Sequence, residues 1–426
     1  MEQWKIYTLE DLCIGKGTYG IGASAVAYDS SKYTYLRITD INDDGTINNS
    51  DLKSVDDEDA YKYILKNNDI VFARTGNSTG RSYFYDGADG ELVYAGFLIK
   101  FSLDPAKINP RIMKYYTHSQ DYYDWVKSFD TGGTRGNINA KTYGLMPITL
   151  PPRHIQDKIV EVLKSLDEKI ELNKRINDNL EQQAQALYKS WFVDFEPFRD
   201  GNFIESEHGL IPEGWQIGTY EQIIQTTISG DWGKDVAMGN YTHKVACVRG
   251  CDFHDMNIGV RGKTPERYIL EKNFQIKKLI DNDVIVEISG GTSTISTGRV
   301  CLINTDLLCK YNNDIVCTNF CKVVRPIQSY GAYLYYSWKY KYDSRVMFGY
   351  ENGTSGIKNF QISDFLSKEP VIIPPESIIK EFQTIIDTLQ HSIQTNGSEI
   401  MKLESLRDSL LPKLMSGELK INETDC

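Results

Sequence analysis

The sequence contains two copies of one pattern, and this internal repeat constrains the fold more than any other feature. The first matches are Trp4, Ile6, Thr8 and Glu10, which recur as Trp215, Ile217, Thr219 and Glu221 at an offset of 211. Later matches are Arg37 with Arg249, Asp40 with Asp252, Asn68-Asp69-Ile70-Val71 with Asn282-Asp283-Val284-Ile285, Gly80-Arg81 with Gly298-Arg299, Gly133 and Gly136 with Gly353 and Gly356, and Pro151-Pro152 with Pro374-Pro375. Across these matches the offset grows from 211 to 223 at the prolines, which indicates a shared framework with a few loop insertions in the second copy.

Each copy opens with a part rich in Gly, Asn, Thr and Tyr, and continues with a part of a different character. The opening parts are residues 1–150 and 201–373. Short β-type runs such as Asp69–Ala73 and Val93–Phe101 lie between turn residues in the first of them. This pattern predicts a mixed α/β globule in each copy.

The second part of each copy predicts a long helix. It follows a proline pair, which suits a helix start, and its apolar residues have coiled-coil spacing. They are Ile155, Ile159, Val162, Leu166, Ile170, Ile176, Leu180, Leu187 and Trp191, and in the second copy Ile378, Phe382, Ile385, Leu389, Ile393, Ile400, Leu403, Leu410 and Leu414. No breaker interrupts Arg153 to Val193, so the first helix should be a rod of roughly 60 Å.

Two such rods of equal phase in one chain are expected to pair with each other, since an apolar seam needs a partner. Asn173 and Asn396 fall at matching seam positions, where a polar pair can fix the register. The alternative is that both asparagines face solvent. Asn396-Gly397 leaves the continuity of the second helix open.

Composition sets limits on the class of protein. With 426 residues the chain is too long for one ordinary core, and 41% apolar with 25% charged residues is typical of a globular protein. No run is long enough to span a bilayer. Met1 to Leu12 lacks the layout of a secretory signal, so we expect a cytoplasmic protein without disulfides. A net charge of −11 argues against a protein that coats nucleic acid non-specifically.

Cysteine pairs raise the question of a metal. Cys247 with Cys251 and Cys317 with Cys321 have a spacing that could be read as a zinc site. Their counterparts in the first copy are Tyr35, Thr39, Tyr94 and Leu98, which bind no zinc. We therefore interpret the cysteines as small core residues and expect no metal.

Catalytic machinery is not evident in the sequence. A P-loop pattern is missing, and the proline pairs read LPPR and IPPE, without the aromatic residue on which a methyltransferase stacks a flipped base. Asp167-Glu168-Lys169 resembles part of a metal nuclease motif, but it is expected on the solvated face of the helix. The histidines show no triad or metal spacing. We expect no catalytic residues and no enzyme activity in this chain.

Polar loops in both globules suit nucleic-acid recognition instead. Arginine can bind guanine or phosphate with two hydrogen bonds, asparagine can pair with adenine, and glycine lets the backbone approach closely. The candidate DNA-binding residues are Arg74, Thr75, Asn77, Ser78, Thr79, Arg81, Thr134, Arg135, Asn137 and Lys141 in the first copy, and Thr292, Ser293, Thr294, Arg299, Thr354, Ser355 and Lys358 in the second. Ordinary turns use the same residue types, so an individual residue can also be structural.

Three stretches carry a family resemblance. Residues 151–198, PPRHIQDKIVEVLKSLDEKIELNKRINDNLEQQAQALYKSWFVDFEPF, resemble the central spacer of the specificity subunits of Type I restriction-modification systems. HGLIPEGWQIGTY from His208 is similar to the start of that family's second recognition domain, and LRDSLLPKLMSGEL from Leu406 to its usual ending. The resemblance covers essentially the whole chain.

The resemblance implies an α+β fold with two mixed α/β target recognition domains, joined by two long helices that form an intramolecular antiparallel coiled coil with pseudo-two-fold repeat. The expected domains are 1–150 (target recognition domain 1), 151–200 (first spacer helix), 201–373 (target recognition domain 2), 374–416 (second spacer helix) and 417–426 (C-terminal tail). Each recognition domain would read one half of a bipartite site in double-stranded DNA.

The same resemblance implies partners. Two methylase subunits would bind the spacer helices, and restriction subunits would join them in the full complex. S-adenosylmethionine, ATP and magnesium are expected on those partners, with no cofactor on this chain. The alternatives are the specificity subunit of a related Type II system, a DNA-acting enzyme with unfamiliar motifs, and a coiled-coil scaffold whose globules bind protein or sugar.

Overall fold

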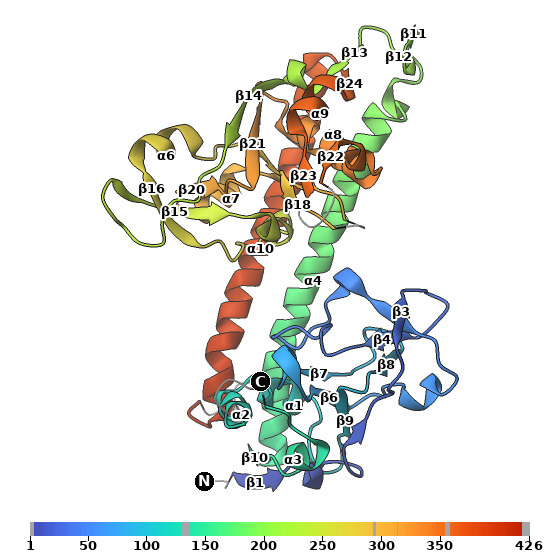
Figure 1. Cartoon of the computed structure of the whole chain (residues 1–426), viewed down its shortest axis with the longest axis vertical. Helices are drawn as coiled ribbons and strands as arrows, with labels where there is room; N and C mark the ends of the chain where they lie inside the picture. The colour runs from blue at the N-terminus through green and yellow to red at the C-terminus, as the bar shows by residue number, and fades with distance from the viewer. Residues whose placement is uncertain (1–3, 130–135, 293–294, 313, 354–357, 420–426) are drawn as a thin grey trace. The chain divides into compact units, whose positions relative to one another are not determined.

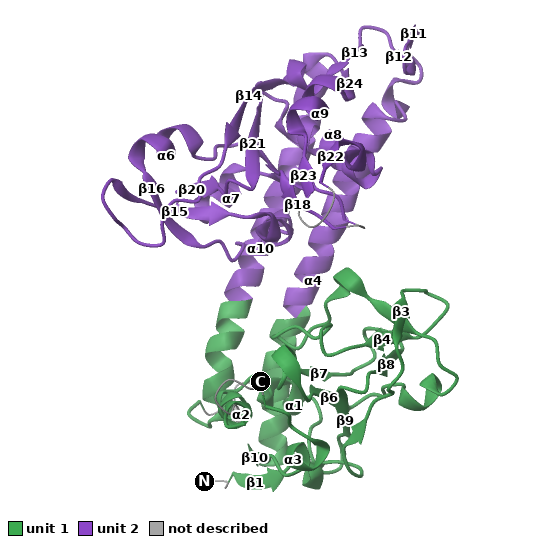
Figure 2. Ribbon diagram, viewed as in Figure 1, with its two compact units in different colours: residues 1–168, 404–426 green, residues 169–403 purple. Residues whose placement is uncertain are grey.

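A computed structural model describes residues 4–129, 136–292, 295–312, 314–353 and 358–419 (Figure 1). The chain divides into two compact units. Unit 1 comprises residues 1–168 and 404–426, and unit 2 comprises residues 169–403 (Figure 2). Each unit therefore combines one globule with a segment of each of the two long helices.

The two long helices are α4 (Arg153–Phe192) and α10 (Glu376–Met415). Helix α10 continues through Asn396 and Gly397, which answers the question that the sequence left open, and it includes Pro412 in its last turns. In unit 1 Leu163 of α4 shares a core with Leu411 of α10. In unit 2 Asn177 of α4 accepts a hydrogen bond from Asn396 of α10. Further contacts join Asp167 to Arg407 in unit 1 and Asn173 to Glu399 in unit 2, so within each unit the residue numbers fall along α10 as they rise along α4, and the pairing is antiparallel.

The buried face of α4 differs in detail from the predicted seam. Ile159 and Ile170 are buried as expected, but Ile176 is 39% exposed and the neighbouring Asn177 is buried in its place. Asn177 donates hydrogen bonds to the carbonyl oxygens of Ile258 (2.9 Å) and Ile393 (3.1 Å), so its amide is satisfied inside unit 2. The predicted partner of Asn396 is also wrong, because Asn173 donates to Glu399 while Asn396 bonds to Asn177.

The globule of unit 1 is built from two four-stranded sheets and a strand pair. The sheet orders are β2-β9-β6-β7 and β3-β5-β4-β8, and β1 pairs with β10. The strands are β1 (Lys5–Thr8), β2 (Thr18–Tyr19), β3 (Ala25–Ala27), β4 (Thr34–Leu36), β5 (Lys53–Val55), β6 (Asp69–Ala73), β7 (Ser82–Phe84), β8 (Leu92–Tyr94), β9 (Leu98–Ser102) and β10 (Pro147–Leu150). Helices α1 (Ile112–Tyr116), α2 (Gln120–Lys127) and α3 (Ala140–Gly144) complete unit 1.

The globule of unit 2 repeats this arrangement with additions. Its sheet orders are β14-β21-β17-β19, β16-β15-β20 and β18-β23-β22, with the pairs β13-β24 and β11-β12. The strands are β11 (Phe203–Ser206), β12 (Gly209–Pro212), β13 (Gln216–Thr219), β14 (Ile224–Ser229), β15 (Tyr241–Val248), β16 (Glu266–Leu270), β17 (Val284–Glu287), β18 (Ser289–Gly290), β19 (Val300–Leu302), β20 (Ile315–Cys317), β21 (Cys321–Pro326), β22 (Glu351–Asn352), β23 (Lys358–Phe360) and β24 (Pro370–Ile373). The helices are α5 (Phe253–Asn257), α6 (Glu271–Lys277), α7 (Thr305–Cys309), α8 (Gly331–Asp343) and α9 (Ile362–Lys368).

The two globules share one topology. Strands β6, β9 and β7 of unit 1 correspond in order and direction to β17, β21 and β19 of unit 2. The parallel pair β4-β8 corresponds to the parallel pair β15-β20. Even the unusual backbone conformations recur, since Asn68 and Asn282 have φ of 73° and 67°, and Gly80 and Gly298 have φ of 87° and 88°. The sequence repeat is therefore a repeat of structure.

An ion pair fixes the same bend in each globule. Arg37 donates from Nε to Asp40 at 2.9 Å and from Nη2 at 2.6 Å. Arg249 donates in the same way to Asp252, at 3.1 and 3.0 Å. Both aspartates are nearly buried and also accept a hydrogen bond from the backbone N–H of their arginine. The match of these residues in the sequence thus reflects a structural role.

No helix of the described part of the chain is long and apolar enough to cross a membrane.

Candidate nucleic-acid interface

In each unit the two predicted contact loops lie against each other. In unit 1 the carbonyl of Arg74, directly after β6, accepts a hydrogen bond from the N–H of Ile138 at 3.0 Å. In unit 2 the carbonyl of Ile288, directly after β17, accepts one from the N–H of Phe360 at 2.9 Å. Backbone pairing thus joins residues that are 64 positions apart in unit 1 and 72 positions apart in unit 2, so the two loops of each globule are neighbours.

Arg74 contacts residues of two other segments of unit 1. Its Nε donates to Oδ1 of Asn137 at 3.3 Å, and its guanidinium lies over the ring of Tyr19, 5.0 Å from the centroid. The hydroxyl of Tyr19 accepts a hydrogen bond from the N–H of Ala140 at the start of α3. Arg74 is therefore held in a defined orientation by a ring and an amide, as a preorganised recognition residue requires.

Some of the other predicted residues of the first loop are exposed to solvent, and others are buried or hydrogen-bonded within the protein. Asn77 is exposed and Thr75 is half-buried, whereas Ser78 is 5% exposed. Thr79 donates to the carbonyl oxygens of Gly76 (2.8 Å) and Gly136 (3.1 Å), so its hydroxyl ties the two loops together.

Arg81 has protein partners on another loop of the same unit. Its Nε donates to Asp43 at 2.7 Å and its Nη1 to the carbonyl oxygen of Ile41 at 2.9 Å. In the second predicted set, Asn137 and Lys141 are exposed. Thr134 and Arg135 lie outside the described residues.

In unit 2 the predicted cations form ion pairs. Arg299 donates to Glu287 from Nε at 2.8 Å and from Nη2 at 2.7 Å, and these hydrogen bonds raise the pKa of the guanidinium. Lys358 bonds to Glu351 at 2.7 Å and lies 5.0 Å from the centroid of the Phe348 ring.

Of the remaining predicted residues of unit 2, the structure describes Thr292. Thr292 accepts a hydrogen bond from the N–H of Ile295 through its hydroxyl, as in an ordinary turn. Ser293, Thr294, Thr354 and Ser355 lie outside the described residues.

Two exposed aromatic residues were not among the predicted contacts. Phe97 is 60% exposed and Phe320 is 55% exposed, and each lies beside the first contact loop of its unit. The signal that could have found them is the repeat itself, because Phe97 and Phe320 match at an offset of 223.

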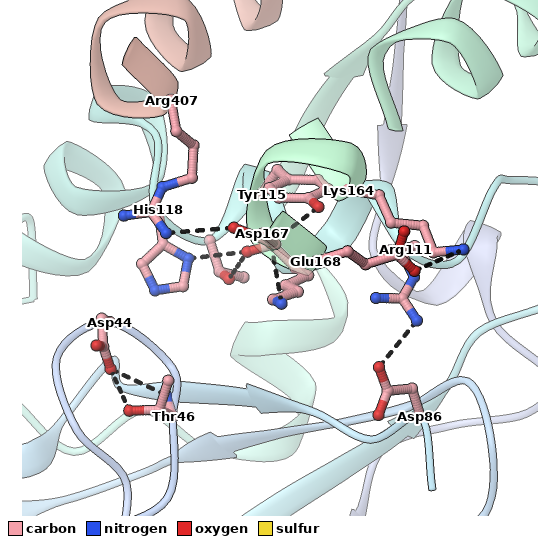
Figure 3. A network of polar contacts seen from close by, with 12 residues as sticks. Asp44, Thr46, Asp86, Arg111, Tyr115, His118, Lys164, Asp167, Glu168 and Arg407 are labelled. Atoms are coloured by element: carbon pink, nitrogen blue, oxygen red, sulfur yellow. Dashed lines mark hydrogen bonds and ion pairs between the residues drawn. The ribbon is translucent and has the colours of Figure 1, made fainter. Parts of the chain in front are cut away.

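Asp167 does not lie on a solvated helix face, contrary to the sequence interpretation. Its carboxylate accepts hydrogen bonds from Lys114 (3.1 Å) and Tyr115 (3.0 Å) of α1 and from Arg407 (3.2 Å) of α10 (Figure 3). The side chain is 18% exposed. Helix α1 packs on this part of α4, which the helix sequence alone does not reveal, so Asp167 anchors the unit 1 globule to both long helices.

Three of the four paired cysteines are core residues as predicted, but Cys251 is exposed, so the interpretation is wrong for that residue. Burial raises the pKa of the Cys247 thiol to about 12, and its Sγ donates to the carbonyl oxygen of Asp231. Cys317 and Cys321 are buried as well. Within the described ranges no cluster of three or more His, Cys, Asp or Glu side chains has the arrangement of a metal site.

Comparison with known proteins shows which class of proteins the chain is similar to. The family model of the Type I restriction modification DNA specificity domain matches residues 1–182. The specificity subunit of the Type I restriction enzyme HindI of Haemophilus influenzae is 24% identical over 98% of this chain and its own full length. The MjaIX specificity subunit of Methanocaldococcus jannaschii is also 24% identical, over 72% of this chain and 69% of that protein.

A solved structure agrees with the fold. The S subunit of a Type I restriction-modification system from M. genitalium is similar with a TM-score of 0.53 and 16% identity, over 97% of this chain and 96% of that one. The matched domain and these relatives make the chain similar to DNA specificity proteins of the Type I restriction-modification class, and the solved structure agrees in fold. Within that class the chain is similar to the specificity subunit, and the resemblance and fold class predicted from the sequence are confirmed.

Proposed function

We propose that this specificity subunit reads a bipartite site in double-stranded DNA, one half with each globule, and directs partner methylase and restriction subunits to it. The observation that carries the proposal is the duplicated topology. Two globules with the same strand order, each with its paired contact loops, provide two similar but separately variable reading surfaces in one chain.

The residues of unit 1 suit DNA contact in detail. A guanidinium fixed by a tyrosine ring and an asparagine amide can reach guanine or a phosphate, and the exposed Asn77, Asn137 and Lys141 add hydrogen-bond donors around it. Arg81, Arg299 and Lys358 already bind carboxylates of the protein. We infer that these three shape the surface more than they read bases.

Partner binding is proposed for the long helices. Leu172 and Ile176 are 43% and 39% exposed on α4, one helical turn apart within unit 2. Exposed apolar residues that adjoin on a helix are typical of a protein interface. We assign them to a methylase contact. The chain itself would be non-catalytic, with S-adenosylmethionine, ATP and magnesium bound by the partners.

The proposal is tested by mapping methylated adenines in cells with and without the gene. We expect loss of one bipartite motif. The purified chain alone, incubated with duplex DNA and either S-adenosylmethionine or magnesium, should neither methylate nor cleave. Modification or cleavage by the chain alone would contradict the non-catalytic role, and an unchanged methylation pattern would contradict the reading role. The genes of the partner subunits distinguish a Type I from a related Type II system.

A further inference from the structure

Each unit displays a phenylalanine at the same position of the same tight turn. In unit 1 the turn Ala95–Leu98 joins β8 to β9 and closes with a 2.8 Å hydrogen bond from the N–H of Leu98 to the carbonyl of Ala95. In unit 2 the turn Thr318–Cys321 joins β20 to β21 with the equivalent bond at 2.9 Å. The third residue of each turn is the exposed Phe97 or Phe320. The residue pattern predicts one strand over Val93–Phe101, and this turn divides it into β8 and β9.

Equivalent backbone hydrogen bonds join each turn to the first contact loop of its unit. The carbonyl of Phe97 accepts from the N–H of Arg74 at 3.1 Å, and the carbonyl of Phe320 accepts from the N–H of Ile288 at 2.9 Å. Each aromatic residue is thereby joined directly to the first contact loop of its own unit.

Hydrogen bonds from the sheet hold the start of each turn. The N–H of Ala95 donates to Leu36 at 3.0 Å, and the N–H of Thr318 donates to Val248 at 2.9 Å. Because both ends are bonded to strands, the ring projects from a rigid support in both units.

Close backbone packing fixes the turns further. A side chain at Gly20 would place its Cβ 2.2 Å from the carbonyl oxygen of Tyr94, and one at Gly230 would place it 2.0 Å from that of Thr318. Real Cβ atoms do not approach so closely, so each glycine is required where the turn packs on the neighbouring strand. The two glycines pack against corresponding carbonyl groups, those of Tyr94 and Ala95 in unit 1 and those of Cys317 and Thr318 in unit 2.

Exposure of one apolar side chain is common and by itself indicates nothing. Here the exposure recurs in two copies whose turns otherwise differ, since Ala95-Gly96 corresponds to Thr318-Asn319. The ring and its support have been retained while the adjacent side chains changed. A rigid exposed ring beside a loop proposed to read DNA suits contact with a duplex, because thymine presents a methyl group in the major groove and an apolar side chain can insert between base steps.

We propose that Phe97 and Phe320 are a matched pair of base-contacting residues, each of which packs its ring against bases of the half-site read by its own unit. The ligand is double-stranded DNA, and phenylalanine side chains are known to wedge between base steps or pack on base edges. This inference rests on the proposed function and adds to it an apolar contact common to both half-sites.

The test uses the full chain co-expressed with its methylase subunits. Binding is measured by fluorescence anisotropy on three duplexes: the mapped site, and the same site with either the first or the second half altered. We expect Phe97→Ala and Phe320→Ala each to weaken binding of the mapped site roughly 5- to 150-fold. Each variant should also tolerate alteration of one half-site, and the two variants should tolerate opposite halves.

Two further readouts separate a ring contact from a structural defect. Phe97→Tyr and Phe320→Tyr keep the ring and should bind within a few-fold of the wild type. The dependence of affinity on salt should keep its slope in the alanine variants, because no phosphate-binding charge is removed. Thermal unfolding should stay unchanged, since the rings are mostly exposed.

Control variants remove other exposed apolar side chains. Tyr61→Ala in unit 1 removes an aromatic residue that is 59% exposed and whose repeat counterpart, at offset 214, is Gln275. Ile276→Ala in unit 2 removes one that is 64% exposed. Both variants should bind DNA like the wild type.

Two results would overturn the inference, and a third would overturn the proposed function on which it rests. If Phe97→Ala and Phe320→Ala bind all three duplexes like the wild type, the rings do not contact DNA. If these variants lose the methylase subunits on co-purification, the rings dock protein instead. A wild-type complex with no preference for the mapped site would contradict the proposed function itself, which is a different outcome from wild-type selectivity with unaffected variants.

Discussion

Arg299 donates two hydrogen bonds to the carboxylate of Glu287, from Nε at 2.8 Å and from Nη2 at 2.7 Å. In the sequence Arg299 follows Gly298 in a polar loop and is a candidate DNA contact. In the structure its guanidinium neutralises the carboxylate of Glu287, which is 8% exposed. This ion pair shows that Arg299 stabilises the fold of unit 2, in contrast to an arginine whose guanidinium is available to contact DNA.

Arg299→Ala should destabilise unit 2. The substitution leaves Glu287 buried without its partner, and an unsatisfied buried group costs about 1–3 kcal/mol, towards the lower end here because Arg299 is 40% exposed. Urea unfolding of the variant, followed by tryptophan fluorescence, measures the loss. Arg299→Ala with wild-type stability and reduced affinity for one half-site would show that the arginine reads DNA after all.

Arg74→Ala should behave in the opposite way. Its partners Tyr19 and Asn137 are partly or fully accessible to water, so we expect little loss of stability but a loss of about 1–3 kcal/mol in binding to the half-site of unit 1. Anisotropy with duplexes altered in one half at a time measures it in the complex with methylase. Equal losses on every duplex would identify a phosphate contact, and no loss would remove Arg74 from the interface.

Gly397→Ala should destabilise unit 2 although alanine favours helix by about 1 kcal/mol over glycine. A Cβ at Gly397 would lie 1.9 Å from the carbonyl oxygen of Gly259, so the loop after α5 would have to move away from α10. Such overpacking costs about 1–3 kcal/mol. Differential scanning calorimetry measures the shift, with Gly349→Ala as a control in open space. An equally or more stable Gly397→Ala would contradict the close approach.

Acid should weaken unit 1 through Asp167. Burial opposes ionisation of this carboxyl, but Lys114 and Arg407 outweigh burial, so its pKa lies below the ordinary value. A depressed folded-state pKa contributes stability above the unfolded value near about pH 4, and that stability is lost as the pH falls through the folded value. Asp167→Asn should lower the unfolding temperature at pH 7 and flatten its decline below about pH 4. Parallel wild-type and variant curves would contradict this role.

Leu172→Glu combined with Ile176→Glu should prevent stable binding of methylase subunits. Two apolar side chains lost from an interface should lower the affinity about tenfold or more. Co-purification and analytical ultracentrifugation measure assembly, and Gln182→Glu, at an exposed position of the same helix, serves as control. Normal assembly of the double variant would place the methylase contact elsewhere.

The sequence alone determined the elements that depend on local or periodic patterns. The repeat, the two long helices and the strand Asp69–Ala73 follow from residue spacing and turn residues, because these report backbone conformation directly. The tertiary structure decided which polar side chains bind other protein groups and which are available to a ligand. Arg81 and Arg299 meet Asp43 and Glu287, and Asp167 meets α1, through contacts between segments distant in sequence, which no local pattern encodes.

Contacts between distant segments also explain why the buried face of α4 differs from the predicted one and why Phe97 and Phe320 were not predicted as contact residues. Asn177 replaces Ile176 on the buried face because carbonyl groups of unit 2 satisfy its amide, and coiled-coil spacing carries no information on a third segment. Phe97 lies within Val93–Phe101, which the sequence predicts as one strand. Only the folded backbone, through the turns and glycine contacts that support Phe97 and Phe320, decides that their rings face outward.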